Sequence, residues 1–200
     1  MNIGTIVVAA GASSRMGRSK QLLEIEGEPL LCRCIKVALA VNAENVIVIL
    51  GANEKPHREI IRKFPVHVIN NFYWKTGLGS SIKTGMNYLI QNVVELDAVI
   101  ILVCDQPALT AEHIKKMIEK FMEKKKAIVA SRYANSNGVP VLFGRSFFSN
   151  LLLLSDDQGA KKIVQQFPDQ VATIDFPKGA FDLDTEEDYQ NYINKKATQK

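Results

Sequence analysis

The chain of 200 residues has little of what marks a secreted, zinc-binding or membrane protein. It holds three cysteines, Cys32, Cys34 and Cys104, an odd number without the spacing of a disulfide framework or of a C-x-x-C motif. Its three histidines are scattered, so they indicate no zinc site. The first apolar run, Ile6–Ala10, has no basic segment before it and is far shorter than the ~20 residues of a membrane helix. We therefore expect a cytoplasmic protein that does not contact a membrane.

Two common nucleotide-binding fingerprints are also missing. The segment Ala9–Lys20 is rich in small residues, but Gly17 is followed by Arg18, so it contains neither Gly-x-x-x-x-Gly-Lys-Ser/Thr nor Gly-x-Gly-x-x-Gly. This excludes a P-loop ATPase and a dinucleotide-binding enzyme. The net charge of +4 is compatible with anionic ligands. Because aromatic and basic residues are not interleaved, we expect no nucleic-acid partner.

What the sequence does contain is a regular alternation of apolar runs and amphipathic stretches. Continuous β-branched runs are typical of parallel strands that are buried on both faces. They cover Ile3–Ala9, Asn45–Leu50, Val66–Ile69, Ala98–Val103, Ala127–Ser131, Val139–Phe143 and Val171–Ile174. Helices are expected over residues 29–41, 54–64, 78–93, 145–154 and 159–167, after a cap at Thr110, and after a capping box at Thr185 and Asp188. This order predicts an α/β fold, one three-layer α/β/α domain over residues 1–194, with a frayed tail at 195–200.

The segment Ala9–Lys20, here called the first loop, directly follows the first predicted strand. Ligands in such sheets bind beyond the carboxyl ends of the strands. Small residues allow backbone N–H groups to approach an anion, Arg15 offers a rigid fork for phosphate oxygens, and Lys20 adds a mobile point charge. A plain turn with incidental charges is the alternative, but the combination of small residues, Arg-Met-Gly and Lys favours a phosphate site.

Two carboxylates follow other predicted strands. Asp105 comes directly after the run 98–103, and Asp184 precedes the last predicted helix. Each could serve only as a turn or capping residue. Held together on rigid strand ends, however, two carboxylates can share one Mg²⁺, which prefers oxygen ligands.

A third polar segment follows the run 66–69. Asn71 and the small residues of Gly77–Ser81 stand at a predicted helix start, where free N–H groups suit a phosphate or the polar edge of a base. The neighbouring Phe72 and Trp74 could form a stacking platform, but we expect them to pack in the protein, as we do Cys104.

With these residues in view, the chain resembles the molybdenum cofactor cytidylyltransferases, within the wider superfamily of glycosyltransferase-A-like nucleotidyltransferases. The resemblance covers essentially the whole chain. It is carried by the first loop and by Gly77–Ser81, Cys104–Pro107, Gly138–Pro140, Asp157–Ala160 and Asp182–Thr185. It implies a Rossmann-like fold of the nucleotide-diphospho-sugar transferase type, with a mixed, mainly parallel sheet that holds one antiparallel strand.

The resemblance also implies an activity and a set of site residues. The activity is Mg²⁺-dependent transfer of CMP from CTP to the phosphate of molybdopterin or molybdenum cofactor, with a molybdoenzyme or maturation protein as the partner that receives the product. The resemblance assigns catalysis to Arg15, Lys20 and Asp105, and metal binding to Asp105 and Asp184. It assigns nucleotide binding to Ala9, Ala10, Gly11, Ala12, Ser13, Arg15, Gly17, Lys20, Asn71, Gly79, Ser80 and Asp105. It assigns acceptor binding to Gly138, Val139, Pro140, Asp157 and Gly159.

The sequence departs from the family pattern on the acceptor side. Val139 stands where members often carry His, and Asp156 stands where they often carry Gly. On the nucleotide side, related guanylyltransferases have a Gly-Gly pair where this chain has Ala10 and Gly11, so the methyl group of Ala10 is expected to favour CTP over GTP. A guanylyltransferase, a nucleotidyltransferase with another phosphorylated acceptor, and a non-catalytic cofactor-binding protein remain the alternatives.

Overall fold

The computed structural model describes residues 1–41, 44–123, 125–133 and 136–197. Its centre is a seven-stranded sheet of order β5-β4-β1-β6-β8-β7-β9. The strands are β1 (Asn2–Ala9), β4 (Val46–Leu50), β5 (His67–Asn70), β6 (Leu96–Val103), β7 (Ile128–Tyr133), β8 (Ser136–Gly144) and β9 (Val171–Asp175). Only β8 runs antiparallel to its neighbours, β6 and β7. The seven expected strands and the single antiparallel strand are therefore confirmed.

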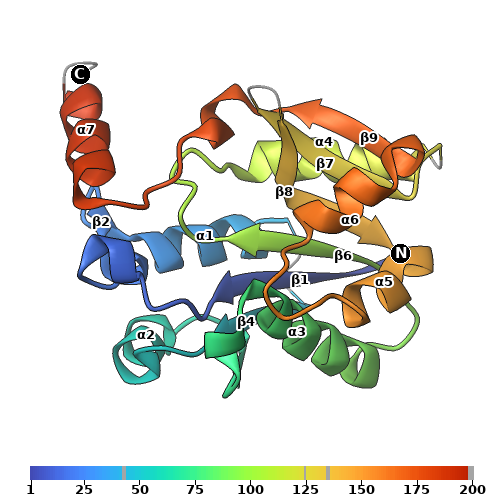
Figure 1. Ribbon diagram of the computed structural model, residues 1–200, viewed down its shortest axis with the longest axis horizontal. Coiled ribbons are helices and arrows are strands. Elements are labelled where there is room, and N and C mark those ends of the chain that lie inside the picture. The colour runs from blue at the N-terminus through green and yellow to red at the C-terminus, as the bar shows by residue number, and fades with distance from the viewer. Residues whose placement is uncertain (42–43, 124, 134–135, 198–200) are drawn as a thin grey trace.

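Helices cover both faces of this sheet (Figure 1). On one face, α1 (Leu30–Leu39), α2 (Glu54–Ile61) and α4 (Ala111–Met122) pack on a core that contains Val7 and Val48. On the other, α3 (Leu78–Asn92), α5 (Phe148–Leu152) and α6 (Lys161–Gln166) pack on a core that contains Ile6 and Ile47. Successive residues of β1 and β4 serve opposite cores because strand side chains alternate between faces. The predicted three-layer α/β/α fold is confirmed.

The predicted helix caps are also present. The side chain of Thr110 accepts a hydrogen bond from the backbone N–H of His113 at the start of α4. Thr185 and Asp188 exchange hydrogen bonds at the start of the last helix, α7 (Glu186–Ala197). Such contacts span three residues, so a short sequence pattern predicts them.

One predicted helix boundary is corrected. Pro29 ends a small hairpin, β2 (Glu24–Ile25) with β3 (Glu28–Pro29), and caps α1 from outside instead of lying in its first turn. Helix α7 continues through residue 197, and residues 198–200 of the expected tail lie outside the described part of the chain.

Helix α7 packs beside the hairpin rather than on the main sheet (Figure 1). Tyr189, Tyr192 and Ile193 of α7 contact a third core. That core consists of Met16, Leu23, Ile25, Leu30 and Leu183. It fixes the segment before α7 against the residues that follow the first loop, next to the carboxyl end of the sheet. None of the helices within the described residues is long and apolar enough to cross a membrane.

Candidate functional site

Charged side chains from three distant segments meet beyond the carboxyl ends of β1 and β6. Lys20 Nζ lies 2.5 Å from Asp105 Oδ2 and 3.2 Å from Asp184 Oδ1. Arg15 contacts the other oxygen of Asp184, with Nη2 and Oδ2 2.9 Å apart. These are the four charged residues to which the sequence assigned the nucleotide and the metal, and the fold brings all of them together.

The fold explains this convergence. Strands β1 and β6 are adjacent and parallel, so Asp105 emerges beside the first loop. The segment before α7 reaches the same point because the backbone N–H of Leu183 donates to the carbonyl oxygen of Asp105, at 3.0 Å. Leu183 is fully buried in the third core, and this anchor holds Asp184 in place.

The cluster is partly withdrawn from water. The side chains of Lys20 and Asp105 are 18% and 17% exposed, whereas that of Arg15 is 71% exposed. Burial alone would lower the pKa of Lys20, but the neighbouring carboxylate of Asp105 outweighs it and raises that pKa, with help from Asp184. Lys20 is therefore held as a cation between two anions.

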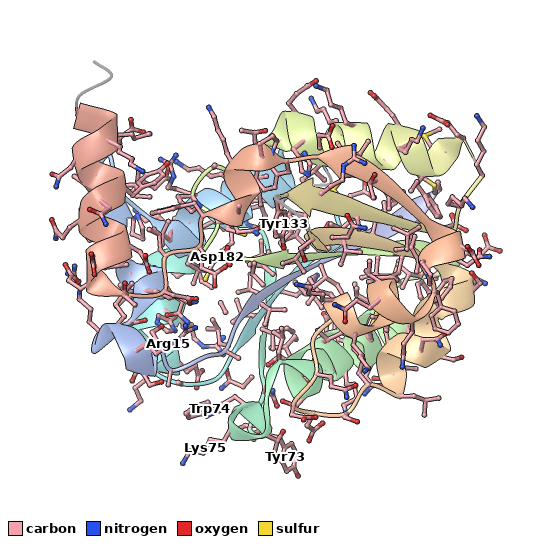
Figure 2. The ribbon with its side chains drawn as sticks, turned by 45° about the horizontal axis from the view of Figure 1, so that its top comes forward. Arg15, Tyr73, Trp74, Lys75, Tyr133 and Asp182 are labelled. Carbon is pink, nitrogen blue, oxygen red and sulfur yellow. The ribbon has the colours of Figure 1, made fainter. Side chains whose placement is uncertain are left out.

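A third carboxylate, Asp182, stands close to this cluster. Burial, and then the negative charges of Asp105 and Asp184, raise the pKa of Asp182 to about 6. Figure 2 shows Asp182 beside Tyr133, with Arg15 and then Trp74 farther down in that view. In the sequence, Asp182 belongs to the motif Asp182–Thr185 but has no predicted role. Nothing in the local sequence shows that its carboxylate lies near those of Asp105 and Asp184.

The donor set suits a hard divalent cation. Asp105 Oδ1 is buried and has no hydrogen-bond partner, so one carboxylate oxygen is available for a ligand. Magnesium and manganese both take carboxylate oxygens. Within the part of the chain that the structure describes, no three His, Cys, Asp or Glu side chains form a ready metal cluster. Asp105 and Asp184 are therefore the candidate ligands among the described residues, and phosphate oxygens and water would supply the rest of the metal's shell.

The first loop has the geometry of a tight, folded-back turn. Ala9 and Ala10 are buried, whereas Gly11 and Ala12 are exposed. Ser13 and Gly17 have φ angles of 54° and 71°, and this left-handed region is one that Gly adopts at low cost and Ser does not. The loop therefore presents small residues and Arg15 to solvent, next to the carboxylates.

Asn71 directly follows β5 and Ser80 lies in the first turn of α3, and their side chains are bonded inside the protein. Asn71 Nδ2 donates to the hydroxyl oxygens of Ser80 and Ser81, at 2.8 and 3.0 Å, and Asn71 is 2% exposed. Ser80 in turn donates to backbone carbonyl oxygens, among them that of Tyr73. Both side chains brace the turn that leads into α3.

Gly79 is required by packing. Its N–H donates to the carbonyl oxygen of Asp156 at 2.8 Å, and a Cβ there would collide with the carbonyl oxygen of Ser155. The segment 155–158 therefore lies directly against the start of α3. Asp156, one of the two departures from the family pattern, forms an ion pair with Lys83 of α3.

The two predicted acceptor segments pack on different elements. In β8, the carbonyl oxygen of Val139 accepts a hydrogen bond from Gln106, which follows Asp105, and a Cβ on Gly138 would collide with the hydroxyl of Tyr133. Pro140 accepts from Ser131 of β7. Asp157 and Gly159 instead belong to the segment against α3, where Gly159 packs on Leu78. The first segment thus adjoins the charged cluster through Gln106, whereas no hydrogen bond or ion pair among the described residues joins Asp157 to it.

The aromatic residues behave differently from one another. Trp74 packs in the protein, as predicted. It lies so close to Gly51 that a Cβ added to Gly51 would be 2.6 Å from the Cβ of Trp74 and 2.8 Å from the carbonyl oxygen of Ala10. The predicted packing of Phe72 is wrong, since Phe72 is 85% exposed. It follows β5, which is the strand at one edge of the sheet. Cys104 is buried in the core as expected, and burial raises the pKa of its thiol to about 12.

Two buried residues that no sequence motif marked support the first loop from beneath. Gln21 is 1% exposed and His57 of α2 is fully buried. Gln21 adjoins Lys20 in the sequence, which is a weak local signal. His57 gives none, because its contact with the loop depends on how α2 packs.

Comparison with known proteins agrees with this geometry. Residues 5–171 match the model of the MobA-like NTP transferase domain. Among curated proteins, the chain is similar to the purine catabolism protein PucB of Bacillus subtilis, with 24% identity over 80% of this chain and 79% of that protein. It is 26% identical to a probable molybdenum cofactor guanylyltransferase of Pyrococcus horikoshii over 68% of this chain and 65% of that protein. It also matches the bifunctional protein GlmU of Bartonella quintana, with 28% identity over 76% of this chain, and spans about a third of that protein (33%).

Solved structures share the fold over the full length. Rv0371c of Mycobacterium tuberculosis, in complex with manganese, has 24% identity and a TM-score of 0.76 over 97% of this chain and 99% of that one. CMP:2-keto-3-deoxy-manno-octonic acid synthetase, complexed with CTP, has 14% identity and a TM-score of 0.76 over 100% of both chains. The fold is therefore that of the nucleotide-diphospho-sugar transferase type.

Proposed function

The chain belongs to the MobA-like NTP transferase family of nucleotidyltransferases, and we propose that it transfers CMP from CTP to the phosphate of a molybdopterin-type acceptor, with release of pyrophosphate. The observation that carries the proposal is the contact of Lys20 with both Asp105 and Asp184, beside Arg15 and a loop of small residues. Two cations and two carboxylates at the carboxyl edge of a parallel sheet suit a triphosphate and its counter-ion.

The reaction needs no nucleophile from the protein. An oxygen of the acceptor phosphate forms a bond to the α-phosphorus of CTP, the bond between that phosphorus and the bridging oxygen to the β-phosphate breaks, and pyrophosphate leaves with the electron pair. The protein contributes position and charge. Arg15 and Lys20 neutralise the triphosphate, and Lys20 is the better placed to follow the growing charge because its ammonium is mobile.

Asp105 and Asp184 are the residues that would hold the divalent metal. When bound, such a metal draws charge from phosphate oxygens and so makes the phosphorus more electrophilic. Magnesium is proposed because it prefers oxygen ligands and keeps phosphate oxygens in its shell, and the manganese in the mycobacterial relative supports a divalent ion of this kind. Lys20 pairs with both carboxylates in the free protein, so triphosphate binding must exchange at least part of that pairing.

CTP is proposed as the donor because Ala10 stands where related guanylyltransferases carry Gly. Ala10 is 2% exposed and belongs to the core on the α3 face, and its methyl group is proposed to narrow the base pocket. The CTP in the synthetase of the same fold supports a pyrimidine nucleotide, and the Pyrococcus relative makes GTP the alternative.

The molybdopterin-type acceptor rests on the family resemblance and on that same relative. A molybdoenzyme or a maturation protein is the partner that such a product requires. The departures at Val139 and Asp156 lie in the two segments assigned to the acceptor, so the acceptor is the part of the proposal that most needs an experiment.

Pyrophosphate release tests the function directly. Purified protein is mixed with Mg²⁺ and molybdenum cofactor, in parallel with CTP, GTP, ATP and UTP. Release with CTP supports the cytidylyltransferase, and release with GTP alone replaces it by a guanylyltransferase. Binding of the cofactor without release with any triphosphate would favour a carrier protein.

A further inference from the structure

Gln21 ties both ends of the first loop to one buried point. Its Nε2 donates to the carbonyl oxygens of Ala9 and Gly11, at 3.1 and 2.9 Å. Its Oε1 accepts from the hydroxyls of Ser13 and Ser19, at 3.1 and 2.7 Å. Both donors and both acceptor sites of the carboxamide are thus used, and no water is needed to satisfy it.

The network continues to Lys20 and to α2. Ser13 Oγ accepts a hydrogen bond from the backbone N–H of Lys20 at 3.1 Å, and Ser19 Oγ lies 2.5 Å from His57 Nε2. The single hydroxyl proton of Ser19 goes to Gln21, so His57 Nε2 must carry the proton that joins the two. This leaves His57 Nδ1, which has no partner, as an unprotonated acceptor of a neutral ring. Burial lowers the pKa of His57, which favours the same neutral ring.

The network has a consequence for an anion in the first loop. Carbonyl oxygens carry partial negative charge and would repel a phosphate, and the amide of Gln21 holds two of them on the protein side of the loop. The hydrogen bonds of Ser13 and Ser19 fix the backbone of Lys20, and so the point from which its side chain extends. Ser13 keeps its left-handed φ of 54° although a serine disfavours it, so the network must oppose that cost.

We infer that Gln21 is a positioning residue for the triphosphate, which acts by ordering the first loop and Lys20 and does not itself touch the ligand. The inference rests on the proposed nucleotide site. Gln21 makes no contact with Asp105 or Asp184, so its effect on turnover must pass through the loop. A buried amide that served stability alone would affect the whole fold equally.

Two variants separate these roles. Gln21→Met keeps the length of the side chain and removes all four hydrogen bonds. Gln21→Glu keeps the acceptor for Ser13 and Ser19 and loses the donation to Ala9 and Gly11. Ile35→Val is the matched control, because Ile35 is fully buried in α1 and belongs to the core of that face.

The first readout is hydrogen–deuterium exchange of the free protein. We expect the backbone N–H groups of Met16, Gly17 and Lys20, which are bonded within the loop, to exchange at least about tenfold faster in Gln21→Met than in wild type or Ile35→Val. We expect Gln21→Glu to protect them better than Gln21→Met does. Unchanged exchange in the loop of Gln21→Met would overturn the inference.

The second readout is pyrophosphate release as a function of triphosphate concentration. We expect Gln21→Met to raise the KM for the triphosphate and lower kcat, together by about tenfold or more in kcat/KM, since a small misplacement near the chemistry is costly. A KM equal to that of Ile35→Val would overturn the link between Gln21 and the triphosphate. If wild type turns over no triphosphate, the proposed function fails, and loop exchange still decides whether Gln21 orders the loop.

Discussion

Lys20 and Asp105 form an ion pair that is more than four-fifths withdrawn from solvent, with Nζ and Oδ2 2.5 Å apart. The two residues are separated by 85 positions in the sequence. The pair keeps the lysine charged and keeps one carboxylate oxygen of Asp105 free of partners. In the proposed function, the pair would supply a cation for the triphosphate and an oxygen ligand for a divalent metal at the same point.

Replacing Asp105 tests its direct role in catalysis. We expect Asp105→Ala to lower kcat by well over tenfold, a loss of more than about 1.4 kcal/mol of transition-state stabilisation. The control is Asp169→Ala, because Asp169 is an exposed carboxylate at the far end of β9 and should leave kcat unchanged. A loss below tenfold in Asp105→Ala would contradict metal binding by this residue.

Ala10→Gly tests the choice of base. If the methyl group narrows the base pocket, removing it widens the pocket, so we expect the ratio of kcat/KM for CTP over GTP to fall by about tenfold, the lower end of what one methyl-sized contact provides. Ala40→Gly is the control, since Ala40 is exposed at the C-terminal end of α1 and belongs to none of the assigned sites. An unchanged ratio in Ala10→Gly would remove the argument for CTP that rests on this side chain.

Two glycine substitutions compare the cost of a methyl group at a closely packed position with its cost at an open one. A Cβ on Gly79 collides with the carbonyl oxygen of Ser155, whereas a Cβ on Gly11 meets nothing within 4 Å. We expect Gly79→Ala to lower the free energy of unfolding by about 1–3 kcal/mol, as overpacking does, and Gly11→Ala to stay within about 0.5 kcal/mol of wild type. Urea unfolding measures both. Equal stability of the two variants would show that the segment 155–158 yields without cost.

His113 makes stability depend on pH. Its Nε2 lies 2.8 Å from Ser131 Oγ, its ring stacks on Phe176, and burial, with a smaller effect of Lys116, lowers its pKa to about 4. An unfolded histidine has a pKa near 6.5, so between these values the unfolded chain binds more protons. The stabilisation is therefore complete above about pH 6.5 and is lost as the pH falls towards 4.

We expect His113→Gln to flatten this part of the pH profile by up to about 3 kcal/mol, since the pKa values differ by about 2.5 units and one unit corresponds to about 1.4 kcal/mol. His67→Gln is the control, because His67 is exposed. Urea unfolding between pH 4 and 7 gives the profiles. If wild type and His113→Gln lose stability in parallel over this range, His113 is not the group responsible.

The strands and caps were predictable because their causes are local. The composition of an apolar β-branched run such as Val46–Leu50 is enough to predict a buried strand. Thr110 caps its helix through a hydrogen bond from a backbone N–H only three residues ahead. The prediction for Phe72 was wrong for a reason outside its own segment. The turn after β5 lies at the edge of the sheet and leaves Phe72 exposed, and the strand order is not contained in the local sequence.

The amino-acid sequence by itself determined the candidates for the chemistry: a loop of small residues with Arg15 and Lys20, and carboxylates at the ends of predicted segments. Residue type and position along a strand suffice for that, because parallel strands bring their carboxyl ends to one edge. Only the tertiary structure decided that Lys20 reaches both Asp105 and Asp184, that Asp182 joins them, and that Gln21 and His57 support the first loop. Those contacts depend on strand order and on the packing of α2 and α7, which no short-range pattern contains.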